Sequence, residues 1–98
     1  MVKHMIIWKF KEDLEDTHKL AEDIKNSLEG LVSKIDGLLT MNIIIEKLPS
    51  SSGDIMMDSA FEDEQALKDY QVHPLHLEIA NNLVRPYMET RLCVDYKI

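Results

Sequence analysis

Two spacings of apolar residues alternate along the chain, and their order restricts the fold more than any single motif does. Apolar residues at every second position predict strands, whereas apolar residues recurring every three or four positions predict amphipathic helices. The expected strands are Val2–Phe10, Leu38–Leu48, Asp54–Phe61 and Tyr87–Tyr96. The expected helices lie between them: one from Asp16 or Thr17 to Ser33, one from Asp63 to Gln71, and one from Pro74 to Val84.

Residues that start and stop helices support these boundaries. The first helix is expected to be capped by Asp16 or Thr17 and to end before Gly37, which can adopt a positive φ. Asp63 is the expected cap of the second helical region. Pro74 divides that region, because proline disfavours helical conformation in the residue before it and suits the first position of a new helix.

The resulting order is β-α-β-β-α-β, which predicts a ferredoxin-like α+β fold with an antiparallel sheet and helices on one face. The middle of the first strand, Met5–Ile7, and of the second, Ile43–Ile45, is apolar on both faces. One face would be left uncovered in a single chain. We therefore expect a symmetric homodimer in which a second copy covers the open face, and Ile44 or Ile45 to lie in that contact.

Composition limits the partners and the compartment. The chain has 98 residues, enough for one domain over residues 1–98, and a net charge of −7. That charge argues against nucleic acids and anionic membranes, and no apolar run reaches the ~20 residues of a membrane span. We read the N-terminus as a strand and not a signal peptide. The lone Cys93 cannot form an internal disulfide, which favours a reducing cytoplasm.

The candidate chemistry is concentrated at the start of the third helix, around His76. On a helical wheel His76 falls at the centre of the apolar arc, so we expect it to be mostly buried. A buried imidazole needs a hydrogen-bond partner, which Tyr70, His73 or the strand residue His4 could supply. His76 is thus either a general acid or base lining a cavity, or a packing residue.

The remaining candidates are weaker. His73 is also expected to cap a helix, and Trp8 shares a strand face with His4; both are candidate ligand-binding residues. His18 is expected on the surface, and Cys93 is expected to be a small strand residue without a catalytic partner. No metal site, cofactor motif or phosphate-binding loop is expected.

Several short motifs in order resemble the Dabb family of stress-responsive dimeric α/β-barrel domains. They include Lys3-His4, Trp8-Lys9-Phe10, Tyr70-x-x-His73-Pro74-x-His76 and Val94-Asp95-Tyr96. The resemblance spans nearly the whole chain and implies that two sheets pair across a two-fold axis to close a dimeric α/β barrel. It extends to plant stress-responsive members and to one plant polyketide cyclase, which forms olivetolic acid by aldol cyclisation.

The resemblance to that cyclase implies catalytic roles for Tyr70, His76 and His4. Two further pocket positions of the cyclase, a histidine and a tyrosine, correspond here to Ile55 and to Leu28 or a neighbour. The polyketide substrate is therefore not carried over. Three functions stay open: binding of a small organic ligand near His76 in a stress-related role; cyclase or lyase catalysis with His76 as general base and Tyr70 assisting; and a structural or interaction module without an active site.

Overall fold

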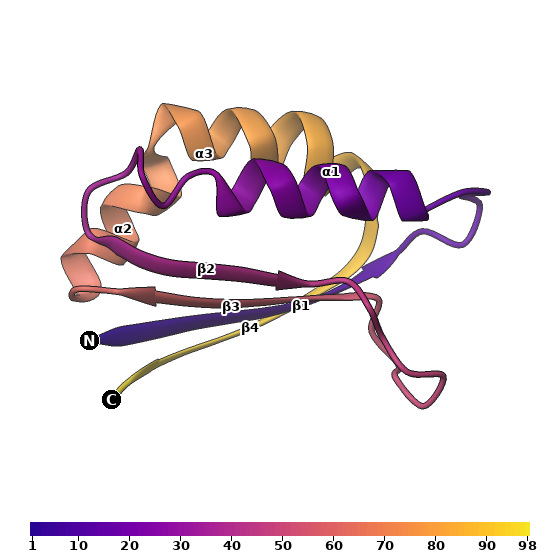
Figure 1. The fold of residues 1–98 in the computed structure, drawn as a ribbon, viewed down its shortest axis with the longest axis horizontal. Coiled ribbons are helices and arrows are strands. Elements are labelled where there is room, and N and C mark those ends of the chain that lie inside the picture. The colour runs from indigo at the N-terminus through magenta and orange to yellow at the C-terminus, as the bar shows by residue number, and fades with distance from the viewer.

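The structure is a computed structural model that describes residues 1–98, and it contains one antiparallel sheet covered on one face by helices (Figure 1). The strands are β1 (Val2–Phe10), β2 (Leu38–Ile44), β3 (Ile55–Phe61) and β4 (Met88–Lys97). The helices are α1 (His18–Glu29), α2 (Glu64–Val72) and α3 (Pro74–Ile79), the last continuing through a π-helical stretch, η1 (Ala80–Val84), and a 3₁₀ turn, η2 (Arg85–Tyr87).

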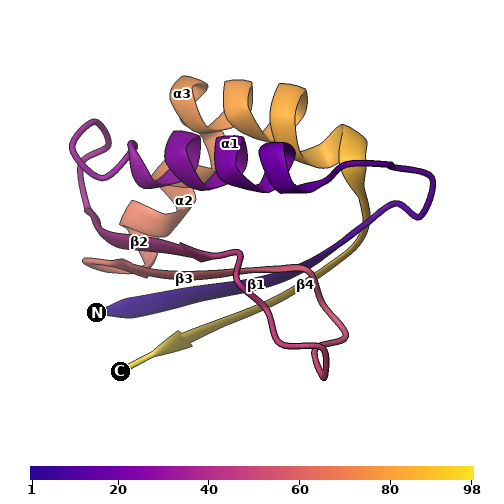
Figure 2. The same cartoon turned by 45° about the vertical axis from the view of Figure 1, so that its right-hand side comes forward.

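The strand order in the sheet is β2-β3-β1-β4, with every neighbouring pair antiparallel. Turning the molecule shows that α1, α2 and α3 all lie on the same side, while the other face of the sheet is bare (Figure 2). The two chain ends lie together beside β1 and β4, and the Ile98 amide donates to the Met1 carbonyl. This arrangement confirms the predicted ferredoxin-like α+β fold.

The core lies between the sheet and the helices, and alternation along β1 assigns its residues. Val2, His4, Ile6, Trp8 and Phe10 all point to the helices and are buried. They meet the buried residues of α1 (Ala21, Ile24 and Leu28) and of α2 (Ala66, Leu67 and Tyr70). Since the strand has a side-chain period of two, this register places His4 at the helix-covered face beside hydrophobic neighbours.

The break between α2 and α3 occurs where the sequence predicts it. The Asp63 side chain accepts from the Ala66 amide at the start of α2. His73 is extended, with φ −66° and ψ 133°, and its Nδ1 accepts from the Leu75 amide 3.1 Å away, capping α3. Pro74 then occupies the first turn, where its missing N–H costs nothing.

Two predicted elements are longer than the observed ones. Helix α1 ends at Glu29 instead of Ser33, and turns carry the chain to Gly37, whose φ is +84°. Leu31 and Ile35 are nevertheless buried, so the apolar spacing continued beyond the regular helix. Strand β2 ends at Ile44 instead of Leu48, and its last pair with β3 joins Ile44 to Met56.

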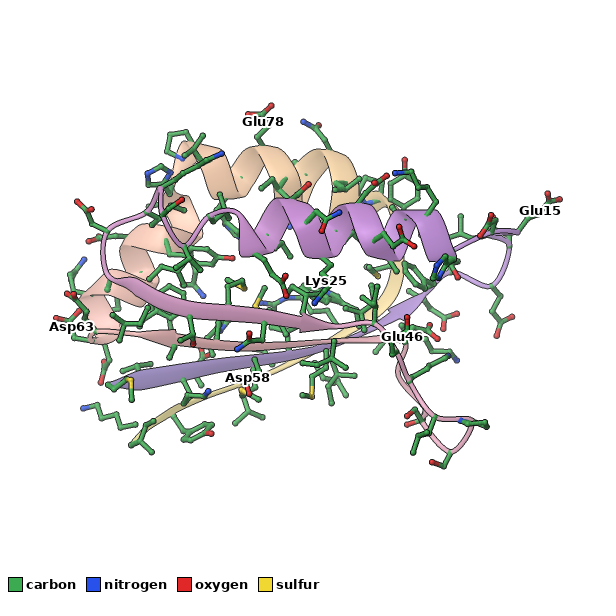
Figure 3. All side chains as sticks on the ribbon, in the orientation of Figure 1. Glu15, Lys25, Glu46, Asp58, Asp63 and Glu78 are labelled. Carbon is green, nitrogen blue, oxygen red and sulfur yellow. The ribbon has the colours of Figure 1, made fainter.

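The ion pair of Lys25 and Glu29 on α1 hydrogen-bonds to backbone groups at the free edge of β2. Lys25 Nζ donates to the Ile43 carbonyl at 2.8 Å, and Glu29 Oε2 accepts from the Ile43 amide at 2.9 Å. The two side chains also bond each other, and Figure 3 shows Lys25 descending from α1 toward the strands. Together they occupy backbone groups that an unprotected edge strand would offer to another chain.

The uncovered face of the sheet carries a row of apolar residues across all four strands. The strand registers place Ile44, Met56, Ile7 and Leu92 side by side in that row. Leu92 is 62% exposed, and Val94 and Tyr96 on the same strand face are exposed as well. Asp58, labelled in Figure 3, forms an ion pair with Lys3. Separately, none of the helices has the length and apolar character that a membrane span requires.

Candidate functional site

A cavity of about 60 Å³ lies between the inner face of the sheet and the helices. The β1 residues His4, Ile6 and Trp8 form its floor, and Tyr70 of α2 and His76 of α3 approach it from the helical layer. The other lining residues are Leu28, Met57, Gln71, Ala80, Val84, Arg85 and Arg91. This volume holds a few water molecules or a group of a few heavy atoms.

Tyr70 contributes a polar group without a partner. Its side chain is fully buried, and its hydroxyl is the one buried side-chain nitrogen or oxygen atom that makes no hydrogen bond. Burial raises the pKa of the Tyr70 phenol far above its ordinary value, and the nearby Arg91 offsets this only in part. The hydroxyl therefore stays protonated and can donate, and leaving it unpaired costs free energy that a ligand oxygen would recover.

His76 stacks on Tyr70 and bonds elsewhere. The two ring centroids are 4.2 Å apart, and the rings are tilted by 37°. His76 Nδ1 lies 3.3 Å from the Gln71 carbonyl oxygen, so its hydrogen-bond partner is this backbone group and not the Tyr70 hydroxyl. Because a carbonyl only accepts, Nδ1 carries the proton of the neutral ring and Nε2 keeps a free lone pair.

Burial lowers the pKa of His76 below its ordinary value of 6.5. The Gln71 carbonyl opposes this shift, whereas the charges of Arg85 and Arg91 reinforce it. His76 is therefore neutral at pH 7. In that state it can accept a proton but has none to give from Nε2, which suits the role of a base.

His4 is held by a carboxylate from the neighbouring strand. The β1–β4 register sets Asp95 opposite His4, and His4 Nδ1 hydrogen-bonds to Asp95 Oδ1. Burial works against the charge on Asp95, but the hydrogen bonds from His4 and Cys93 keep the pKa of this carboxyl below 3.8. The ionised carboxylate accepts from Nδ1, so the neutral His4 ring also has an unprotonated Nε2.

The structure agrees with the expectation that His76 is mostly buried, since the residue has intermediate exposure. The helical wheel assumed one straight α-helix from Pro74 to Val84. The structure instead has six α-helical residues followed by a π-helical stretch, in which the residues that reach the core are Ala80 and Val84. His76 precedes Ala80 by four residues, so it shares the helix face that reaches the core and lines the cavity with Ala80 and Val84.

The structure separates the other predicted residues. Trp8 lines the cavity, as a ligand-binding residue should. His73 does not line it, because its ring is engaged in capping α3. The prediction of a surface position for His18 is confirmed: its side chain is 71% exposed and pairs with Glu22.

Sequence reasoning missed Asp95, Arg91 and Arg85. Cys93 lies in strand β4, as expected, and its Sγ lies 3.3 Å from Asp95 Oδ1 and 3.6 Å from His4 Nδ1. Arg91, Cys93 and Asp95 lie far from His4 in sequence and reach the sheet face that His4 shares only through strand register. Arg85 lies in the turn η2. The alternation Arg91, Cys93, Asp95 along the last strand was the available signal, because it places all three on one face.

Comparison with known proteins agrees with this architecture. The family model described as the stress responsive A/B barrel domain matches residues 2–98. A dimeric protein of unknown function with a ferredoxin-like fold from Bacteroides fragilis is 27% identical, with 99% of this chain and 95% of that chain covered and a TM-score of 0.90. No curated protein gives a match.

Two plant structures share the fold at lower identity. One is an Arabidopsis thaliana protein (23% identity, 100% of this chain and 95% of that chain covered, TM-score 0.83). The other is a hydroxynitrile lyase from Passiflora edulis (18% identity, 99% and 92% covered, TM-score 0.81). The match of the family model over residues 2–98 decides the assignment: the chain belongs to the Dabb family of stress-responsive A/B barrel domains.

Proposed function

We propose that this protein is a homodimer that binds a small β-keto acid, or a similar anionic oxygen compound, in the cavity between sheet and helices. The observation that carries the proposal is the buried Tyr70 hydroxyl without a hydrogen-bond partner. Buried polar groups are almost always paired, so an unpaired donor beside a cavity favours a ligand acceptor. A carbonyl oxygen has the geometry to fill this place.

The charges of the lining favour an anion. The whole chain carries a net charge of −7, yet the charged residues that line the cavity are two arginines, Arg85 and Arg91. A guanidinium recognises a carboxylate through paired N–H donors. A β-keto acid would therefore place its carboxylate toward the arginines and its keto oxygen toward Tyr70.

Homodimerisation is proposed from the open face of the sheet. An apolar row across four strands would otherwise meet water, which is unusual for a monomeric protein. The Bacteroides fragilis protein, similar over nearly the whole chain, is described as dimeric. We also propose a reducing cytoplasm as the location, given the single free thiol. A stress-related role is proposed from the family's description alone.

A second candidate function is proton-transfer catalysis of the lyase or cyclase type. It is favoured by the protonated Tyr70 hydroxyl standing beside His76, a neutral imidazole with a free Nε2. In this reaction Nε2 of His76 would remove the proton between the two carbonyl groups, while Tyr70 would donate a hydrogen bond to the enolate oxygen that forms. The hydroxynitrile lyase with this fold makes lyase chemistry a reasonable class to test.

Ligand binding can be measured with the one tryptophan of the chain, because Trp8 lines the cavity. Acetoacetate should change Trp8 fluorescence saturably, and Tyr70→Phe should weaken binding about two- to tenfold, the value of one hydrogen bond between neutral groups. Tyr87→Phe is the matched control, since it removes a hydroxyl outside the cavity and should bind normally. If the wild type gives no saturable response, the protein does not bind acetoacetate, and the remaining function is that of a structural or interaction module.

Catalysis is tested on the same compound. Exchange of the acetoacetate C2 protons in D₂O, followed by NMR, should be faster with the protein than in buffer. His76→Gln should remove most of a rate enhancement of about 10²–10⁴. If acetoacetate binds without accelerated exchange, the protein is a binding protein and not a lyase.

A further inference from the structure

Three side chains of different chemistry converge where β1 pairs with β4. His4, Cys93 and Asp95 each offer one donor atom, and these atoms all lie within 4.8 Å of one another. Asp95 stands directly opposite His4, and Cys93 precedes Asp95 by two residues and so shares its strand face. Strand register alone therefore brings a nitrogen, a sulfur and an oxygen donor to one point.

The surroundings leave this point open on one side. His4 is only 2% exposed and is fixed by its ring contacts with Phe61 and Tyr70. Cys93 and Asp95 lie on the edge strand β4, where they are exposed. The cluster thus combines one rigid donor with two donors that solvent and ions can reach.

We propose that His4 Nδ1, Cys93 Sγ and Asp95 Oδ1 form a binding site for a divalent metal ion of the zinc class. Imidazole, thiolate and carboxylate are the three ligand types that zinc accepts, and three protein ligands with a fourth position open to water make a complete tetrahedral set. Such a mixed soft and hard donor set does not suit magnesium or calcium, which take oxygen ligands.

The distances fit this ion. Zinc bonds of about 2.0–2.3 Å at tetrahedral angles place neighbouring donor atoms about 3.4–3.6 Å apart. Cys93 Sγ lies 3.6 Å from His4 Nδ1 and 3.3 Å from Asp95 Oδ1. The third pair, His4 Nδ1 and Asp95 Oδ1, is in hydrogen-bond contact and must open by about 1 Å, which the exposed Asp95 side chain can do by rotation.

The same geometry argues against Cys93 as a nucleophile. In a catalytic Cys-His-Asp set the thiol and the carboxylate approach different nitrogens of the ring. Here both approach Nδ1. A metal ion instead uses the convergence: it replaces the proton of the Cys93 thiol, which is released to solvent, and it occupies His4 Nδ1, whose proton moves to Nε2 of the same ring.

Metal binding would change the hydrogen-bonding character of the His4 nitrogen that faces the cavity. This consequence rests on the proposed function, whereas the metal site itself does not. Without metal, Asp95 holds the proton on Nδ1, and Nε2 is an acceptor. With metal on Nδ1 the neutral ring must carry its proton on Nε2, which becomes a donor. A bound ion and an Asp95-paired His4 base are therefore mutually exclusive states.

Cobalt(II) is the direct probe, because a thiolate-to-cobalt charge-transfer band can come only from Cys93, the one cysteine of the chain. Titration of the full-length protein, reduced with a non-chelating phosphine, should give this band with one cobalt per chain, and zinc should displace the cobalt. Asp95→Asn should weaken cobalt binding more than about tenfold. His18→Asn, at an exposed histidine paired with Glu22, should leave it unchanged.

A second measurement needs no variant. Saturating zinc should slow alkylation of Cys93 by iodoacetamide in the wild-type protein at least about tenfold, because the coordinated thiolate is no longer free to react. Unchanged alkylation, absence of the charge-transfer band, a stoichiometry of one ion per two chains, or equal affinity in the folded Asp95→Asn protein would each overturn the site. Acetoacetate binding to the metal-free protein is independent of these outcomes and reports on the proposed function alone.

Discussion

The rings of Tyr70 and His76 lie 4.2 Å apart although they belong to two different helices. A continuous helix would place residues six apart on different faces, but the break at His73-Pro74 turns α3 back over the end of α2. The two side chains consequently line the same cavity, one with a donor hydroxyl and the other with an imidazole. Ligand binding and proton transfer, as proposed, both depend on Tyr70 and His76 lying side by side at the cavity.

Acid titration of His76 should occur below pH 6.5. Burial is the main cause of its lowered pKa, so NMR of the ring protons should give a midpoint under the ordinary histidine value of 6.5. Acetoacetate should move this midpoint upward, because a bound carboxylate near the ring favours the protonated form. A midpoint above 6.5 would contradict the burial of the ring beside Arg85 and Arg91.

Stability should depend on pH through the same residue. Since the pKa of His76 is lower in the folded than in the unfolded chain, the unfolded chain binds more protons below about pH 6.5. The free energy of unfolding should fall as the pH drops from 7 to 5, and His76→Gln should flatten this slope. Urea unfolding of both proteins across that range measures the difference; identical slopes would show that His76 does not contribute.

The open face of the sheet should hold the dimer together. Ile44→Asp places a charge in the apolar row formed with Met56, Ile7 and Leu92, where a dimer would bury it unpaired. Light scattering should give about twice the 11.4 kDa chain mass for the wild type and the single chain mass, with a lower melting temperature, for the variant. Leu48→Asp, in the exposed loop after β2, is the control and should remain dimeric. A monomeric wild type would contradict the proposed dimeric barrel.

The hydrogen bonds from Lys25 and Glu29 to the Ile43 backbone in β2 should contribute to stability. Glu29→Ala leaves the Ile43 amide without its acceptor and should lower the free energy of unfolding by about 1–2 kcal/mol. Glu78→Ala, which removes an exposed carboxylate pointing away from the molecule, is the control and should change it by less than about 0.5 kcal/mol (Figure 3). Equal unfolding curves for the two variants would show that solvent satisfies Ile43 equally well.

Local rules predicted most of the fold. Alternation in β1, helical spacing in α1, the Asp63 cap and the break at Pro74 depend on neighbouring residues, which the sequence displays. The boundaries of α1 and β2 were less accurate because they depend on where a tertiary partner ends. Met56 is the last partner of β2, and no local pattern in residues 45–48 reports that.

The site was predictable only in part, for the same physical reason. Tyr70 and His76 are close in sequence and could be linked by the helix break. The π-helical stretch at Ala80–Val84 follows from packing and has no local signal of its own. Asp95 and Cys93 reach His4 through β1–β4 register, and register is set by the whole sheet.

A crystal structure of the protein soaked with acetoacetate would show directly whether the cavity binds a β-keto acid through Tyr70. We expect the keto oxygen within about 2.6–3.2 Å of the Tyr70 hydroxyl and the carboxylate beside Arg85 or Arg91, with lower occupancy in the Tyr70→Phe crystal under the same conditions. The cavity left vacant in the wild-type crystal, or acetoacetate bound only elsewhere on the molecule, would contradict it.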